Sequence, residues 1–221
     1  MVGVDALEHR VRPSDGEPEG ALVLLHGRGA DHNDLWPLLD ALDPGRRLVG
    51  VTPGGPLSLP PGGSHWYVLG GIGSPEKQSF GDTFARLCGW LDAWLESRSL
   101  TVDQTIVGGF SQGAVMSHAL AFMGGRRRPR ALLAFSGFMP TVEGFTMDLD
   151  NLEGMPVAIG HGTYDPVIGV EWGRRARDRL ESAHADVLYR ESPMGHTIDP
   201  AFVQEVAVSI VARPSSQNRA S

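Results

Sequence analysis

The sequence predicts an α/β protein with a mostly parallel central sheet and helices on both faces. Short apolar runs alternate with longer segments of helical periodicity, which is typical of parallel strands joined by helices. Most of the apolar runs are continuous, as expected of strands that are buried on both sides. We find no internal repeat, and a chain of 221 residues suits one domain, which we place at residues 1–212.

Six apolar runs are predicted to be the strands of the sheet. They lie at Ala21–His26, Leu48–Thr52, Thr105–Gly109, Ala131–Ser136, Val157–Gly160 and Asp186–Arg190. A weaker strand is predicted between Val2 and Val11, because Val2, Val4 and Ala6 alternate with other residues as the side chains of a half-buried strand do.

Three internal helices are predicted from apolar side chains that recur at three- and four-residue steps. The longest contains Phe80, Phe84 and Leu87, and the third carries Trp172 and Leu180 on one face. These helices lie at Ser79–Arg98, Gln112–Met123 and Val170–Ala183.

The last helix has a clear start signal. Asp199 suits the N-cap, and Pro200 suits the first turn, where its missing N–H costs nothing. The side chains on its core face are Val203, Val206, Ala207 and Ile210. Beyond it the tail Arg213–Ser221 is polar, and we expect it to be disordered.

Two long stretches, Pro53–Ser74 and Gly137–Met155, are neither strand nor clear helix. Both follow the carboxyl ends of predicted strands, where open α/β sheets place their sites. Their apolar residues either line a pocket or anchor ordinary loops, and long loops in compact domains are often functional. The candidates for the wall of a substrate pocket are Trp66, Tyr67, Phe138 and Met139.

Composition excludes several classes of protein. A net charge of −7 makes the chain a poor candidate for nucleic-acid binding. No apolar run reaches the ~20 residues that span a bilayer, and Met1–Arg12 lacks the apolar core of a signal peptide. Cys88 is the single cysteine, so neither a disulfide framework nor a zinc site of four cysteines can form. We therefore expect a cytoplasmic protein without an integral membrane segment.

The sharpest motif is Gly109-Phe110-Ser111-Gln112-Gly113, which matches G-x-S-x-G between a predicted strand and a predicted helix. That context is where α/β-hydrolases hold a nucleophilic serine, on a sharp turn whose neighbours must lack bulk. The alternative is a glycine-rich turn with an incidental serine. Ser111 is therefore the candidate nucleophile.

A serine hydroxyl needs a base to take its proton, and His196 is the best candidate. In chain order the base follows the serine and the acid, and the later histidines are His118, His161, His184 and His196. His118 lies within a predicted helix, His184 near a helix end, and His161 is expected to pack its loop. His196 follows the strand Asp186–Arg190 and precedes the last helix, where it could reach Ser111; alone it would be a surface loop histidine.

Asp165 completes the set, because it follows the strand Val157–Gly160. A buried carboxylate there can accept from one ring nitrogen of His196 and leave the other facing Ser111. The rival acids are Asp186, which opens a strand, and Asp199, which is better explained as a helix cap.

Backbone N–H groups are expected to bind the oxyanion of the reaction. One belongs to Gln112, directly after the nucleophile, and the other to the first strand–helix loop, which contains Gly27 and Gly29. The same glycines could begin a dinucleotide fingerprint, but His32 occupies its third glycine position. No phosphate-binding P-loop sequence and no H-E-x-x-H zinc motif is present.

Together these blocks resemble the phospholipase/carboxylesterase branch of the α/β-hydrolases, which includes bacterial carboxylesterases and acyl-protein thioesterases. The residues that carry the resemblance span nearly the whole chain: Leu24–Ala30, Gly108–Ala114, His161–Val167 and Gly195–Ile198. It implies an α/β-hydrolase fold without a large lid domain, a Ser111–His196–Asp165 triad, and backbone donors at Arg28 and Gln112. It implies no cofactor and no metal.

The resemblance implies a serine carboxylesterase for a small-molecule ester of small or medium size. The eukaryotic thioesterases of this family have leucine where this chain has Arg28, which disfavours a long-acyl or acyl-protein substrate. An acyl thioesterase or lysophospholipase with the same triad is the alternative, and a catalytically silent receptor for small ligands is an alternative of another class. The sequence leaves open whether the protein forms a homodimer.

Overall fold

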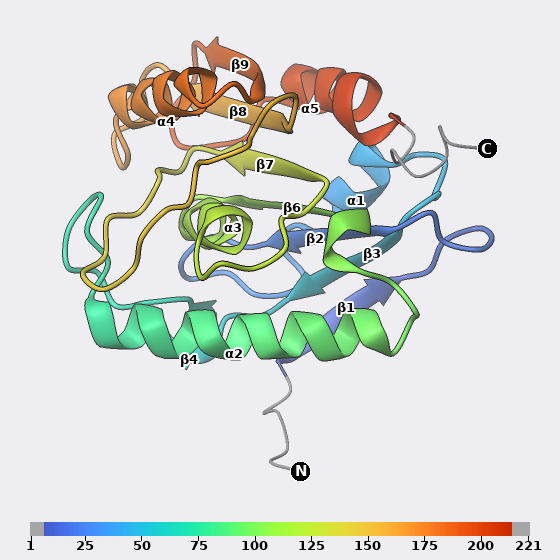
Figure 1. The fold of residues 1–221 in the computed structure, drawn as a ribbon. Helices are drawn as coiled ribbons and strands as arrows, with labels where there is room; N and C mark the ends of the chain where they lie inside the picture. Colours follow the sequence, from blue (N-terminus) through green and yellow to red (C-terminus); the bar gives the residue numbers. More distant parts are fainter. Residues whose placement is uncertain (1–6, 214–221) are drawn as a thin grey trace.

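The structure, a computed structural model, describes residues 7–213. Its centre is a seven-stranded sheet in the order β1-β3-β2-β6-β7-β8-β9 (Figure 1). β1 runs antiparallel to β3, and every other neighbouring pair is parallel. The strands are β1 (His9–Arg12), β2 (Ala21–Leu25), β3 (Val49–Pro53), β6 (Thr105–Phe110), β7 (Ala131–Phe135), β8 (Pro156–Gly162) and β9 (Asp186–Ser192).

Helices cover both faces of this sheet (Figure 1). Successive side chains of a strand point to opposite faces. In β2, Ala21, Val23 and Leu25 therefore pack with α2, α3 and α4, whereas Leu22 and Leu24 pack with α1 and α5. The helices are α1 (Trp36–Leu42), α2 (Lys77–Glu96), α3 (Gln112–Phe122), α4 (Val170–Ser182) and α5 (Pro200–Val206), which continues as a π-helical turn, Ala207–Val211.

The six main predicted strands and the four predicted helices are confirmed, with small shifts at their ends. α2 begins two residues before the predicted Ser79, because the carboxylate of Glu76 accepts hydrogen bonds from the N–H groups of Gln78 and Ser79, both at 2.8 Å. The weak strand predicted between residues 2 and 11 is found as His9–Arg12, and residues 1–6 lie outside the described residues.

Three features were not predicted from the sequence. α1 is only seven residues long, so its apolar pattern covers too few turns to be recognised. β4 (Leu57–Ser58) and β5 (Ser64–His65) form a two-stranded hairpin inside the predicted loop Pro53–Ser74. The short helix η1 (Val102–Gln104) also precedes β6.

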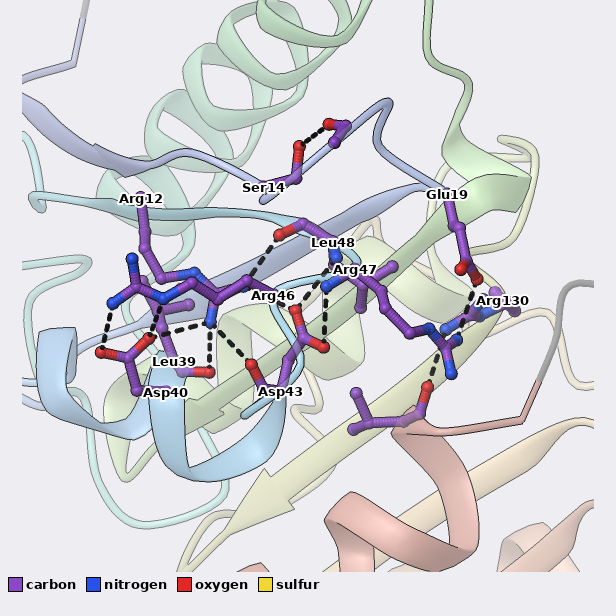
Figure 2. A network of polar contacts seen from close by, with 12 residues as sticks. Arg12, Ser14, Glu19, Leu39, Asp40, Asp43, Arg46, Arg47, Leu48 and Arg130 are labelled. Atoms are coloured by element: carbon purple, nitrogen blue, oxygen red, sulfur yellow. Dashed lines mark hydrogen bonds and ion pairs between the residues drawn. The ribbon is translucent and has the colours of Figure 1, made fainter.

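A buried arginine joins β1 to the end of α1 (Figure 2). The guanidinium of Arg12 donates to the carboxylate of Asp43 at 2.6 Å and to the carbonyl oxygens of Leu39 and Leu48 at 2.7 and 2.8 Å. Arg12 and Asp43 are both buried. Because Leu48 directly precedes β3, this network lies at the amino end of that strand, opposite the edge that holds the candidate site.

Residues 214–221 of the predicted tail lie outside the described residues, and the described Arg213 forms an ion pair with Asp186 at 2.7 Å. Within residues 7–213, no helix combines the length and the apolar character that crossing a bilayer demands.

Candidate active site

Ser111 lies on a strained turn between the end of β6 and the start of α3. Its backbone has φ 54° and ψ −120°, a conformation that residues other than glycine rarely adopt. The chain turns so sharply that a Cβ on Gly109 would lie 2.5 Å from the carbonyl carbon of Gly113. A Cβ on Gly113 would collide with the carbonyl oxygen of Leu25 in the neighbouring strand. Both glycines of the motif are therefore required by close backbone contacts.

The three candidate side chains meet at the carboxyl ends of three strands. Ser111 follows β6, Asp165 follows β8 and His196 follows β9. The Nε2 atom of His196 lies 2.9 Å from the hydroxyl oxygen of Ser111. Its Nδ1 atom lies 2.6 Å from Oδ2 of Asp165. This geometry fits the imidazole tautomer in which Nδ1–H donates to the carboxylate and Nε2 accepts from the hydroxyl.

The backbone holds Asp165 in place. Its Oδ1 atom accepts hydrogen bonds from the N–H groups of Val167 and Ile168, at 2.8 and 2.9 Å. The carboxylate is fully buried, and a buried charge is costly unless polar groups surround it. The two N–H groups and the imidazole of His196 supply these polar contacts. Because Oδ1 is held by the two N–H groups, the carboxylate cannot rotate freely, and Oδ2 stays directed at His196.

The other late histidines do not reach Ser111. His161 is buried beneath the loop of Asp165, where its Nε2 atom lies 2.8 Å from the carbonyl oxygen of Ile168 and 3.6 Å from the Asp165 carboxylate. This agrees with its predicted packing role. His118 is buried within α3, and His184 is exposed at the end of α4.

The loop after β2 carries Arg28, and the β4–β5 hairpin holds that loop. The N–H of Gly29 donates to the carbonyl oxygen of Ser64, and the N–H of Ser64 donates to that of Ala30, both at 2.8 Å. The loop is thus paired with the hairpin as a short additional strand would be, which fixes the path of its backbone.

His26 supports this loop from below. Its Nδ1–H donates to the carbonyl oxygen of Gly27 at 2.7 Å, and its Nε2 atom accepts from the N–H of Gly55 at 2.8 Å. Burial lowers the pKa of His26, so the ring stays neutral and can accept at Nε2. The sequence indicated only the glycines of this loop and not the role of His26 as its brace.

The two residues predicted to supply backbone donors line the same cavity as the nucleophile. Arg28 and Gln112 line it together with Ser111 and His196. The N–H of Gln112 is the first of α3, and the N–H groups of a helix's first turn have no partner within the helix. The positive end of the helix dipole lies there as well, so negative charge at this point is favoured.

The side chain of Gln112 has a role that the sequence did not reveal. Its Oε1 atom accepts from the N–H of Trp66 at 2.9 Å, and its Nε2 atom donates to the carbonyl oxygen of Tyr67 at 2.8 Å. It thereby holds the loop Pro53–Ser74 against the nucleophile turn. The available signal was a polar amide at the start of a largely apolar helix, because such a group must find hydrogen-bond partners when it is buried.

The cavity beside Ser111 has a volume of about 340 Å³. Of the predicted wall residues, Tyr67 and Phe138 line it, whereas Trp66 and Met139 do not. Both of these are buried in the core, and the indole N–H of Trp66 donates to the carbonyl oxygen of His26 at 2.8 Å. Burial and a satisfied indole N–H place Trp66 in the core beneath the cavity and not among the residues that line it. The apolar wall residues that the prediction missed are Leu69, Ile72, Val167 and Ile168.

Leu69, Ile72 and Val167 are 56, 54 and 52% exposed, so the mouth of the cavity is rimmed by apolar side chains in contact with solvent. The run of apolar residues in a glycine-rich loop was the available signal for Leu69 and Ile72. A larger, more polar hollow of about 540 Å³ is lined by residues such as Asp31, His32 and Ser64, and not by Ser111 or His196.

A family model described as Phospholipase/Carboxylesterase matches residues 7–212. The chain is 29% identical over 194 residues to acyl-protein thioesterase 1 of Debaryomyces hansenii, covering 76% of this chain and 79% of that one. Its structure is similar to the crystal structure of the Bacillus cereus carboxylesterase, with a TM-score of 0.80, 22% identity, and 92 and 93% of the two chains covered.

The carboxylesterase from Mesorhizobium loti is similar with a TM-score of 0.79 and 22% identity, covering 93% of this chain and 96% of that one. The predicted α/β-hydrolase fold is confirmed by these likenesses together with the mostly parallel sheet and its flanking helices.

Proposed function

The chain belongs to the phospholipase/carboxylesterase family, and on that premise we propose that it is a serine carboxylesterase for carboxylic esters of small or medium size. Membership makes it a hydrolase of the carboxylesterase and acyl-protein thioesterase type. The observation that carries the finer proposal is the chain of two contacts from Ser111 through His196 to Asp165, at 2.9 and 2.6 Å.

In the first half-reaction the Ser111 oxygen attacks the carbonyl carbon of the ester, and His196 Nε2 takes the hydroxyl proton. The C–O bond to the alcohol then breaks, and His196 returns that proton to the leaving oxygen. The product is an acyl group on Ser111. Asp165 stabilises the imidazolium that forms in between and keeps the ring in the productive orientation.

In the second half-reaction a water molecule gives its proton to His196 and attacks the acyl carbon. The carboxylic acid leaves as the proton passes back to Ser111. In both halves the tetrahedral oxyanion accepts hydrogen bonds from the N–H groups of Arg28 and Gln112, two residues that line the cavity with Ser111.

The size of the cavity supports small or medium esters over long ones. A volume of about 340 Å³ is at the low end of ligand pockets, which run from about 300 Å³ upward. The open apolar rim gives an acyl chain some wall to contact, but no separate lid covers the site within residues 7–213.

An acyl thioesterase is the second candidate, favoured by the 29% identity to a protein named acyl-protein thioesterase 1. Its reaction would use the same three side chains. A lysophospholipase is a further candidate of the same mechanism, and a silent receptor would bind its ligand without turnover.

The experiment that separates these candidates has two parts. Labelling with a fluorophosphonate, which reacts with activated serines, should modify Ser111 if the protein is an enzyme and leave a receptor unmodified. A panel of p-nitrophenyl esters of graded chain length, acyl thioesters and lysophospholipids then compares kcat/KM between the enzyme classes. The proposal expects the highest values for short or medium p-nitrophenyl esters, and a higher value for thioesters or lysophospholipids would overturn it.

A further inference from the structure

Arg28 carries a side chain beside the backbone N–H group that the sequence singled out. The residue is exposed and is one of those that line the cavity containing Ser111 and His196. A guanidinium carries five N–H donors and a permanent positive charge. Within residues 7–213, the structure records no ion pair and no hydrogen bond for this side chain.

Most other arginines in residues 7–213 form an ion pair or a hydrogen bond, whereas Arg28 lines the cavity without either. Arg174 makes a bidentate contact with Glu191, both bonds at 2.7 Å, and Arg12 holds Asp43. The chain has a net charge of −7, so carboxylates are plentiful. Those of the same loop point elsewhere: Asp31 accepts from the N–H of Asn33 and lines the separate polar hollow.

The rest of the cavity lining makes a positive charge there effective. Apart from Arg28, Ser111, Gln112 and His196, the residues that line it are Gly71, Tyr67 and apolar residues, none of which carries a charge near neutral pH. No carboxylate lines the cavity in the part of the chain that the structure describes. An anion that lies against these apolar walls is screened by fewer water molecules than one at an open surface, which strengthens its attraction to the guanidinium.

We propose that the Arg28 side chain is an anion subsite, and that the substrates are esters carrying a carboxylate a few atoms from the scissile carbonyl. This inference rests on the proposed function. The N–H of Arg28 would face the oxyanion, and its guanidinium is displaced from that point only by the length of its own side chain. One residue would then bind both the reacting carbonyl and a nearby carboxylate, the latter by a bidentate contact.

Two pairs of substrates distinguish a carboxylate in the acyl half from one in the leaving half. Monomethyl glutarate and dimethyl glutarate share an acyl skeleton and differ in whether its far end is charged. 4-Acetoxybenzoate and its methyl ester differ in the same way on the leaving phenol. The measured quantity is the ratio of kcat/KM for the charged member to kcat/KM for the neutral member.

Arg28→Gln keeps the backbone N–H and removes the charge. Any effect on the oxyanion acts on both members of a pair and cancels in the ratio. We expect the substitution to lower the ratio about tenfold in one of the two pairs, the scale of one hydrogen bond to a charged group, and Arg28→Lys to restore part of it. Arg127→Gln, which removes an exposed charge from the run at residues 126–130, should leave both ratios unchanged.

Rising salt concentration should lower the wild-type ratio and leave that of Arg28→Gln unaffected. Equal ratios for wild type and Arg28→Gln in both pairs would overturn the subsite. A wild-type protein that is labelled by a fluorophosphonate but hydrolyses neither charged ester also contradicts it, while leaving the hydrolase proposal standing. A protein that is neither labelled nor active on any ester contradicts the hydrolase proposal itself.

Discussion

The imidazole Nε2 atom of His196 lies 2.9 Å from the hydroxyl oxygen of Ser111, although 85 positions separate the two residues in the chain. They meet because Ser111 follows β6 and His196 follows β9, and parallel strands of one sheet end at the same edge. If the hydroxyl passes its proton to this nitrogen, the chemistry depends on both residues and on the orientation of the ring.

Substitution Ser111→Ala should remove nearly all esterase activity while the protein stays folded. By analogy with other serine triads the loss in kcat is about 10⁴–10⁶-fold. The matched control is Ser182→Ala, an exposed serine at the end of α4, which should keep wild-type turnover. Steady-state kinetics and circular dichroism measure the two properties. A folded Ser111→Ala protein with wild-type turnover would end the triad proposal.

Substitution Asp165→Asn should lower kcat by about 10⁴-fold, because an amide favours the wrong imidazole tautomer. Asp199→Asn is the control for a nearby carboxylate. Asp199 accepts from the hydroxyl of Ser192 at 2.5 Å and from the N–H of Ala201 at 2.9 Å, so it caps α5 and does not contact His196. Loss of turnover in Asp199→Asn together with an active Asp165→Asn protein would refute the assignment of the acid.

The value of kcat/KM should fall when the solution is made acidic. The reason is that a protonated imidazole cannot accept the serine proton, so the histidine base must be neutral. Initial rates at low substrate concentration between pH 5 and 8 measure the profile. Rates that stay constant over this range, with chemistry rate-limiting, speak against a histidine base.

The gain in kcat/KM per methylene should stop after short or medium acyl chains. Each buried CH₂ contributes at most ~0.8 kcal/mol, and only while the cavity of about 340 Å³ offers wall to contact. Phe138→Ala removes part of that wall and should shift the point at which the gain stops. A wild-type profile that climbs steadily to palmitoyl esters would favour the thioesterase or lysophospholipase instead.

Trp66→Ala is the matched comparison for the chain-length experiment. Because Trp66 is fully buried and does not line the cavity, its removal should lower the free energy of unfolding by about 3–5 kcal/mol. The chain-length profile should keep its shape. Thermal melting and the ester panel, run on the same preparation, separate an effect on stability from an effect on chain-length preference. A displaced profile at unchanged stability would show that Trp66 is part of the cavity wall.

Stability should fall as the pH drops below about 6.5, in part because of His118. Burial lowers the pKa of this histidine to about 3, and its Nδ1 atom has no hydrogen-bond partner among the described residues. Between these values the unfolded chain binds a proton that the folded protein does not, so acid favours unfolding.

Substitution His118→Leu should therefore flatten the decline by about 1.4 kcal/mol per pH unit between pH 6.5 and 4. Urea unfolding at several pH values measures this slope, and His184→Gln, at an exposed position, should leave it unchanged. An identical slope in His118→Leu and wild type would show that His118 does not couple folding to protonation.

The sequence by itself determined the sheet, most of the helices and the positions of Ser111, Asp165 and His196 at strand ends. These features depend on local patterns: apolar runs, helical periodicity and a glycine-flanked turn. The short α1 and the β4–β5 hairpin could not be predicted from the sequence. A seven-residue helix and two-residue strands are too short to show a recognisable repeat of apolar residues.

Only the tertiary structure decided which apolar residues face the cavity and which support it. Trp66 and Leu69 lie three positions apart in one glycine-rich loop, yet the first is fully buried and the second is 56% exposed. No periodicity relates them, because the path of this loop is set by distant partners: Gln112 holds its backbone, and the carbonyl oxygen of His26 accepts from the indole of Trp66. Such contacts join residues that are remote in sequence, and the local pattern of a chain carries no record of them.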